Sequence, residues 1–277
     1  MSVPRGQNRG SQPERGAEEL PCIWSLAGVL QYRLCDRGYE CEECELFHAL
    51  RGGGRSAADA ARTGKEAGGK RQTPAERAAE ELVGKYLSRL ADGCELHLDR
   101  PYSASHFWLQ RADGNRVRLG LDGHLLKVLY PIDDVTLPHV GVRLKRGEPC
   151  GWITRNHLAI PLEVPVSGEV DAVNESYVTE VRERGRPSGG EDWLLSLEAH
   201  EDVESVPDLF RGEEALLWHL GTIQLLKRHL RDAVAASQDV VVGPTLADGG
   251  VPEVNVEQVL GQEAFETLVE DMFHPRI

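Results

Sequence analysis

The apolar positions that follow residue 74 recur at helical spacing. Leu82, Tyr86 and Leu90 fall on one face of a helix. The preceding Thr73-Pro74-Ala75-Glu76 offers an N-cap threonine, a proline suited to the first helical position, and a glutamate that completes a capping box. We therefore expect residues 74–101 to form a helix, ending near Gly93, and a short connection to the next segment.

The same helical period returns after Pro207. An apolar stripe there consists of Leu216, Leu220, Ile223, Leu226, Leu230 and Val234. A turn-rich stretch over 243–252 separates it from a second amphipathic helix that carries Val259, Leu260, Phe265, Leu268 and Met272. Residues 200–277 are therefore expected to form a helical C-terminal region.

Between these helical segments, residues 102–199 contain short β-like runs. The runs are Phe107–Leu109, Val117–Leu119, Val164–Val166, Val170–Val173 and Trp193–Leu197. Turn residues separate the first two (Asp113-Gly114-Asn115) and the next two (Ser167-Gly168), which is the signal of a hairpin. Many short strands in such a span predict a compact barrel or sandwich. With the flanking helices, the fold class is α+β.

Composition and charge bear on partners and location. The chain has 277 residues, of which 40% are hydrophobic and 27% charged, as in ordinary globular proteins. The net charge of −14 gathers at the C-terminal end, where residues 201–277 carry 5 Lys/Arg against 15 Asp/Glu. An acidic surface repels phosphate backbones, so nucleic acid is not an expected partner. No apolar run is long enough to span a membrane, and residues 1–20 lack the apolar centre of a secretory signal. We expect a disordered leader at 1–20, no membrane partner, and a cytoplasmic location.

Four of the six cysteines fall in one block with the spacing C-x12-C-x5-C-x2-C. They are Cys22, Cys35, Cys41 and Cys44. Four thiolates complete the tetrahedral coordination of a structural zinc ion, and the closing Cys-Glu-Glu-Cys places two sulfurs on one turn. We therefore expect a metal-binding module over 21–50, isolated from the rest of the chain by a flexible Gly-rich linker over 51–73.

Zinc is not the only hypothesis for this block. Four cysteines can also hold an iron–sulfur cluster, and a module without metal stays open. His48 is a substitute ligand if one cysteine does not bind. Disulfides are disfavoured in a chain without a secretion signal. Cys94 and Cys150 stand apart and are expected to be buried as small apolar residues.

Three motifs occur in order along the strand-rich region. They are Ser-His-Phe-Trp-Leu (105–109), Gly-Glu-Pro-Cys-Gly-Trp-Ile (147–153) running into Val-Pro-Val-Ser-Gly-Glu-Val (164–170), and Gly-Arg-Pro-Ser-Gly-Gly-Glu-Asp-Trp-Leu-Leu (185–195). Together they resemble the opening segment, the central hairpin with its following strand, and the closing segment of the glycine-cleavage H protein family. The resemblance implies a lipoyl- and H-protein-like barrel-sandwich hybrid over 102–199. The cysteine block before it looks similar to modules that accompany some bacterial H-like proteins.

The resemblance also implies a lysine on the central hairpin, to which lipoate is attached. In the family this lysine stands eight residues before the proline of Pro-Val-Ser, and counting back from Pro165 gives His157. No lysine occurs between Lys145 and Lys227, and imidazole cannot form the stable amide that carries lipoate. We therefore expect a divergent member with no lipoate. A more specific hypothesis makes His157 a ligand or an acid–base group, because histidine titrates near neutral pH. A hairpin tip also tolerates histidine without any such role.

These features predict a protein that is not an enzyme. The leading hypothesis is an adaptor or docking module, in which an H-like β domain and a zinc-stabilised cysteine module bind a protein partner of unknown identity. One alternative is an electron-transfer component whose four cysteines hold an iron–sulfur cluster. Another is a lipoyl carrier of the glycine cleavage system, against which the missing lysine argues.

Overall fold

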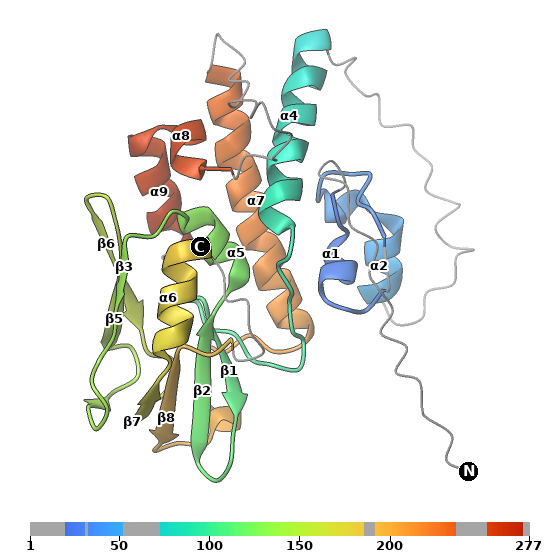
Figure 1. The fold of residues 1–277 in the computed structure, drawn as a ribbon. Helices are drawn as coiled ribbons and strands as arrows, with labels where there is room; N and C mark the ends of the chain where they lie inside the picture. Colours follow the sequence, from blue (N-terminus) through green and yellow to red (C-terminus); the bar gives the residue numbers. More distant parts are fainter. Residues whose placement is uncertain (1–19, 31–32, 52–72, 186–191, 237–253, 274–277) are drawn as a thin grey trace, which may run out of the picture.

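The computed structural model describes residues 20–30, 33–51, 73–185, 192–236 and 254–273 (Figure 1). Residues 1–19 of the expected leader, most of the expected linker and the turn-rich stretch over 243–252 lie outside these residues. Figure 1 shows two long helices, α4 and α7, running side by side, with the β-sheets on one side of them and the cysteine block on the other. The long helices therefore separate the two regions in which the sequence places candidate chemistry.

Both long helices were expected from their apolar stripes. Helix α4 spans Pro74–Ala91, and its capping box is complete, because Thr73 Oγ1 accepts from the Glu76 amide at 3.2 Å while the Thr73 amide donates to Glu76 Oε2 at 2.7 Å. Helix α7 spans Glu213–Ala236 and buries every residue of the expected apolar stripe except Val234, which is half-buried. Among the described residues, no helix combines the length and apolarity needed to cross a membrane.

The final helical segment is two helices rather than one. Helix α8 covers Val256–Leu260 and helix α9 covers Gln262–Phe273. Gly261 between them has φ of +81°, a conformation that an α-helix cannot contain. The break turns α9 so that Phe265, Leu268 and Met272 are buried against the rest of the molecule.

The β-strands form two antiparallel sheets. The five-stranded sheet has the order β1-β2-β8-β7-β4, with β1 at Phe107–Arg111, β2 at Arg116–Leu121, β8 at Leu195–Ala199, β7 at Gly168–Val173 and β4 at Arg143–Leu144. The three-stranded sheet has the order β3-β5-β6, with β3 at Asp134–Thr136, β5 at Pro149–Arg155 and β6 at Leu158–Glu163. The α+β class and the compact two-sheet domain are confirmed, as is the hairpin that joins β1 to β2.

Three details of this domain differ from the expectation. The run Val164–Val166 is not a strand but the crossing between the two sheets, and its valines are fully buried there. Two helices were not expected inside the domain, α5 at Gly123–Leu129 and α6 at Glu175–Arg184. Helix α5 escapes detection because its leucines and valine are buried on every side, which removes the helical period from the pattern.

The cysteine block contains three short elements, which are α1 at Ile23–Leu26, η1 at Cys41–Glu43 and α2 at Glu45–Arg51. Trp24 and Phe47 face each other inside it, with ring centroids 5.7 Å apart. Its apolar side chains join the same hydrophobic core as α4, α7 and the β domain. The expectation that this module is isolated is therefore wrong, because the sequence pattern of a linker does not reveal what packs across it.

A further short helix, η2 at Val203–Ser205, follows β8.

Candidate functional site

The β5–β6 hairpin carries the position at which the resemblance implies lysine. Asn156 and His157 form its two-residue tip, and Asn156 has φ of 50°, which asparagine tolerates better than most residues. The Asn156 amide donates to a carboxylate oxygen of Asp133, which holds the turn. The His157 side chain is 47% exposed. The hairpin that the resemblance implies is confirmed, and His157 stands at its exposed tip.

Helix α9 lies directly against this tip. His157 Nε2 is 2.6 Å from Glu266 Oε1, and Gln262 Nε2 donates to the same carboxylate oxygen at 3.0 Å. The hydrogen bond from His157, followed by that from Gln262, lowers the pKa of Glu266. The imidazole is therefore engaged by the chain's own C-terminal helix.

Arg155, next to the tip, is buried and has a complete set of partners. Its Nε and Nη2 donate to Glu257 Oε2 at 3.1 and 2.8 Å, and Nη2 also reaches Asn255 Oδ1 at 2.8 Å. Its Nη1 donates to the carbonyl oxygens of Leu129 and Tyr130 at 2.6 and 2.8 Å. A planar guanidinium with five donors suits such a set better than any other side chain. The hairpin is thereby fixed to the start of α8 as well as to α9.

A cavity of about 470 Å³ opens beside the hairpin. Its apolar lining includes Leu158, Ala159, Ile160, Leu209, Val269 and Phe273. Glu266 also stands at its wall, so the cavity and the hairpin tip are adjacent. Nothing in the sequence pattern indicated this cavity, because its walls come from segments far apart along the chain.

The four cysteines of the block surround one small cavity of about 20 Å³. An antiparallel bridge between Pro21 and Leu34 brings Cys22 close to Cys35, and the Tyr39 amide lies 3.2 Å from Cys35 Sγ. Cys41 opens η1 and Cys44 closes it. Burial, and after it the neighbouring Cys35, Cys22 and Cys44, raise the pKa of Cys41 to about 12. Burial also raises the pKa of Cys22.

All six cysteines are free thiols, and Cys94 and Cys150 are buried as expected. Within the described residues, however, no three sulfurs of the block lie within 4.8 Å of one another. Bound zinc would draw them closer than this, because each Zn–S bond is about 2.3 Å. His48 does not face the cavity, since its Nε2 lies 2.6 Å from the carbonyl oxygen of Glu42. The structure thus gathers the four expected ligands around one centre, and metal binding stays a prediction.

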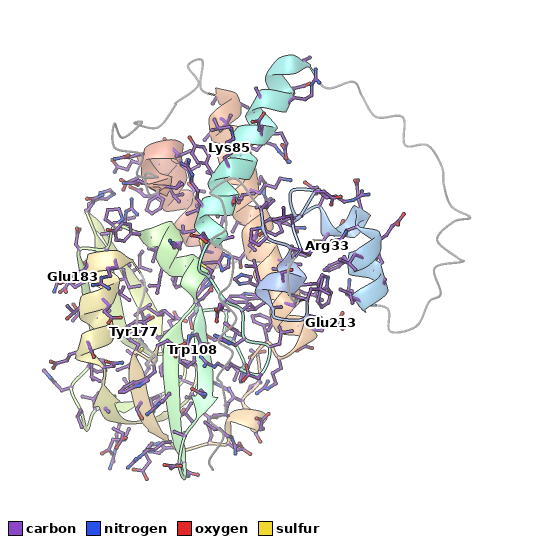
Figure 2. All side chains as sticks on the ribbon, turned by 45° about the vertical axis from the view of Figure 1, so that its right-hand side comes forward. Arg33, Lys85, Trp108, Tyr177, Glu183 and Glu213 are labelled. Atoms are coloured by element: carbon purple, nitrogen blue, oxygen red, sulfur yellow. The ribbon has the colours of Figure 1, made fainter. Side chains whose placement is uncertain are left out.

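Helix α7 holds the cysteine block through a buried lysine. Lys227 Nζ donates to the carbonyl oxygen of Gly38 at 2.8 Å and to Glu40 Oε1 at 2.7 Å, and lies 3.2 Å from Glu80 Oε1 on α4. At the other end of α7, Glu213 accepts from Arg51 at 2.9 Å. Figure 2 shows Glu213 on α7 and Arg33 on the block on the same side of the molecule.

Sequence reasoning missed a buried polar cluster at the centre of the molecule. Asp122 caps α5 by accepting from the His124 amide at 3.1 Å, and its other oxygen lies 3.2 Å from His106 Nδ1. His219 of α7 completes the group, with its ring centroid 4.2 Å from that of His124. All four residues are at most 5% exposed. The only signal in the sequence was Asp122-Gly123-His124 at a possible helix start.

The charges in this cluster are strongly coupled. Burial opposes the charged form of Asp122, but His219, His106 and His124 around it hold its pKa well below the usual value. Burial also opposes the charged form of His124, yet the Cys94 thiol and Asp122 raise its pKa to about 10. Burial and the neighbouring His124 lower the pKa of His219 to about 3. One buried carboxylate thus stands beside two histidines whose pKa values are shifted in opposite directions.

Comparison with known proteins assigns the middle of the chain. Residues 100–217 match the family model described as "Glycine cleavage H-protein". A glycine cleavage system H protein of Rubrobacter xylanophilus is 34% identical over 120 residues, which are 43% of this chain and 91% of the relative. The chain belongs to the glycine cleavage H-protein family.

Two further relatives match over similar lengths. A glycine cleavage system H-like protein of Chlamydia muridarum is 31% identical over 103 residues, covering 37% of this chain and 88% of the relative. A crystal structure of a glycine cleavage system H protein from Mycobacterium marinum is 26% identical, with a TM-score of 0.39, over 45% of this chain and 98% of that one.

The H-protein segment is only part of this family member. It includes both sheets and the β5–β6 hairpin, and it ends at residue 217, near the start of α7. The cysteine block, α4, α8 and α9 all lie outside it. The partners of the hairpin tip, Gln262 and Glu266, therefore come from a part of the chain that the family model does not cover.

Proposed function

We propose that this H-family protein is a docking module without lipoate and without catalytic activity of its own. The observation that carries the proposal is His157, which stands where the family resemblance implies the lipoyl lysine. Its imidazole faces Glu266 on α9 and is thereby engaged by the protein's own C-terminal region. A histidine held in this way supplies neither the amine that lipoylation requires nor a free arm that could move between partner proteins.

The apolar cavity beside the hairpin supports a docking role. It is large enough, at about 470 Å³, to accept an apolar side chain of a partner protein. We propose that the partner is a protein, that nucleic acid and membranes take no part, and that docking occurs in the cytoplasm. Names of the relatives make other components of the glycine cleavage system the first partners to test.

We also propose that Cys22, Cys35, Cys41 and Cys44 hold one zinc ion that stabilises the docking module. Their convergence on one small cavity supports this, because four thiolates leave a zinc ion no open position. Metal analysis of the purified protein should give zinc and a colourless solution. A brown protein with iron and sulfide would instead support the electron-transfer alternative.

Lipoylation in a cell that can attach lipoate tests the main proposal. The chain and the Rubrobacter xylanophilus H protein should be produced in the same cells and weighed intact. We expect the lipoyl mass increase on the relative and none on this chain. Lipoate on the unsubstituted chain, or replacement of an H protein in glycine cleavage, would establish the lipoyl-carrier alternative. The His157→Lys variant asks separately whether the hairpin is still a ligase substrate.

A cavity-filling variant tests docking. Ala159→Trp places a large side chain in the exposed wall of the cavity, whereas Val140→Trp adds the same side chain at a 63% exposed position outside that lining. Tagged protein should retain a protein partner from its native cell with the unsubstituted and Val140→Trp chains, and lose it with Ala159→Trp. Equal retention by all three would exclude the cavity as the docking site.

A further inference from the structure

The Asp122 cluster contains a set of metal-ligand atoms outside both the hairpin and the cysteine block. One ligand atom from each of Asp122, His124 and His219 can be chosen so that all three lie within 4.8 Å of one another. Within the described residues this is the one group of three Cys, His, Asp or Glu side chains that meets the criterion. Two imidazoles and a carboxylate are a common donor set for zinc and for iron(II).

The histidines of this set have unpaired nitrogens in a place where water is excluded. His124 and His219 are 5% and 0% exposed. Neither ring nitrogen of either residue has a hydrogen-bond partner of good geometry. Buried polar atoms are nearly always paired, so four unpaired nitrogens in one cluster require an explanation.

A buried ion pair alone does not supply that explanation. The Nδ1 atoms of His124 and His219 lie 3.8 Å from Asp122 oxygens, beyond hydrogen-bond distance. Protonating one imidazole adds an N–H group that also needs an acceptor, and it leaves the second ring unpaired. A metal ion would instead accept a lone pair from one nitrogen of each ring, which accounts for two of the four unpaired nitrogens, and would balance the Asp122 charge at the same time.

The surroundings of Asp122 resemble those of a metal-binding carboxylate. His106 Nδ1 lies 3.2 Å from one carboxylate oxygen, and its Nε2 is directed at the carbonyl oxygen of Met272 at 3.4 Å. The His124 amide binds the other oxygen. Such outer partners orient ligands in known metal sites.

We propose that Asp122, His124 and His219 bind a divalent transition-metal ion that fastens α7 to the H-protein domain. Asp122 and His124 belong to the H-protein segment, whereas His219 lies just beyond its end at residue 217. Because all three ligands are buried away from substrate, we infer a structural role, for which a fourth donor has to complete the coordination. Zinc holds such ligands at about 2.0–2.2 Å. The ligand atoms, which lie within 4.8 Å of one another, therefore have to approach to roughly 3.4 Å when the ion binds. The Cys94 thiol beside His124 is a further donor within the same region.

Metal counting with matched variants tests the proposal in the full chain. His124→Gln and His219→Gln remove one ligand each, and His229→Gln is the control, because it makes the same change on α7 at a histidine that pairs with Asp271. After reconstitution with zinc and removal of loose metal, we expect each ligand variant to hold one equivalent less than the unsubstituted chain. The control should hold as much. Circular dichroism checks that each variant is folded.

A second measurement uses only the unsubstituted protein and distinguishes zinc bound at this site from zinc bound by the cysteines. Zinc titrated into the metal-free, unsubstituted protein should shift the imidazole ¹⁵N signals of two buried histidines together at a single equivalent. The proposal is overturned if the imidazole spectrum stays unchanged while zinc binds, since the metal would then be held by thiolates alone. Equal zinc content in all the variants would overturn it as well.

Discussion

Arg155 and Lys227 are two buried cations that join different regions to the C-terminal helices. Arg155 fixes the H-protein hairpin to α8, whereas Lys227 fixes the cysteine block to α7 and α4. Both side chains are at most 5% exposed, but their carboxylate partners differ. Glu257 beside Arg155 is 19% exposed, while Glu40 and Glu80 beside Lys227 are 51% and 39% exposed. We therefore expect the loss of Arg155 to cost more stability than the loss of Lys227.

Arg155→Met should have the largest effect. The change removes the two guanidinium donors of Glu257, which keeps the side-chain amide of Asn156, and it removes a donor from the buried Leu129 carbonyl oxygen. Removing one partner of a buried pair costs about 3–5 kcal/mol in free energy of unfolding. Denaturant unfolding measures it. Arg182→Met is the control, because this arginine is 51% exposed and pairs at the surface with Asp134, so its loss should cost less than about 1 kcal/mol. Equal costs for the two variants would contradict the role given to burial.

Lys227→Met should be destabilising by less, about 1–3 kcal/mol, because Glu40 and Glu80 can regain water when the lysine is gone. Arg228→Met on the exposed side of α7 should change the free energy of unfolding by no more than about 0.5 kcal/mol. Hydrogen exchange should show that the cysteine block loses protection in the Lys227 variant while the sheets keep theirs. A loss of protection that is confined to the sheets would contradict the proposed contact.

Acid should weaken the contact between Lys227 and the cysteine block. The hydrogen bond from Lys227 lowers the pKa of Glu40, and the bonds from Arg231 and Lys227 lower that of Glu80 although its burial opposes them. A carboxylate with a lowered folded-state pKa stabilises the protein above its unfolded value of 4.5. This stabilisation is lost as the pH falls from there through the folded-state pKa. Exchange in the cysteine block should therefore rise in acid, and Lys227→Met should reduce this dependence.

His157→Ala should have the smallest effect on stability. The His157–Glu266 pair is exposed on both sides, and exposed pairs contribute little. We expect the free energy of unfolding to stay within experimental error, and hydrogen exchange at the start of α9 to increase. Glu266→Gln should give the same local increase. A cooperative loss of stability would mean that the tip, rather than Arg155, anchors the C-terminal helices.

Local sequence signals determined much of the fold. Thr73 to Glu76 specified the start of α4 because a capping box needs only neighbouring residues. The apolar stripe after Pro207 specified α7, and Asp113-Gly114-Asn115 specified the β1–β2 hairpin. The absence of lysine between Lys145 and Lys227 was also visible in the sequence, and the assignment of His157 to the lipoyl position stays a prediction that rests on counting from the family motifs.

Only the tertiary structure determined the features that depend on which elements pack against each other. Gly261 divided a single expected helix, and Val164–Val166 links strands of two different sheets, with both valines buried. Arg155 could be read from the sequence only as a surface residue near a hairpin tip, yet Asn255 and Glu257, about a hundred positions later, make its burial possible. His219 likewise lies beside Asp122 only because α7 packs against the H-protein domain. Spacing along a chain carries no information about side chains that approach each other only after the helices have packed.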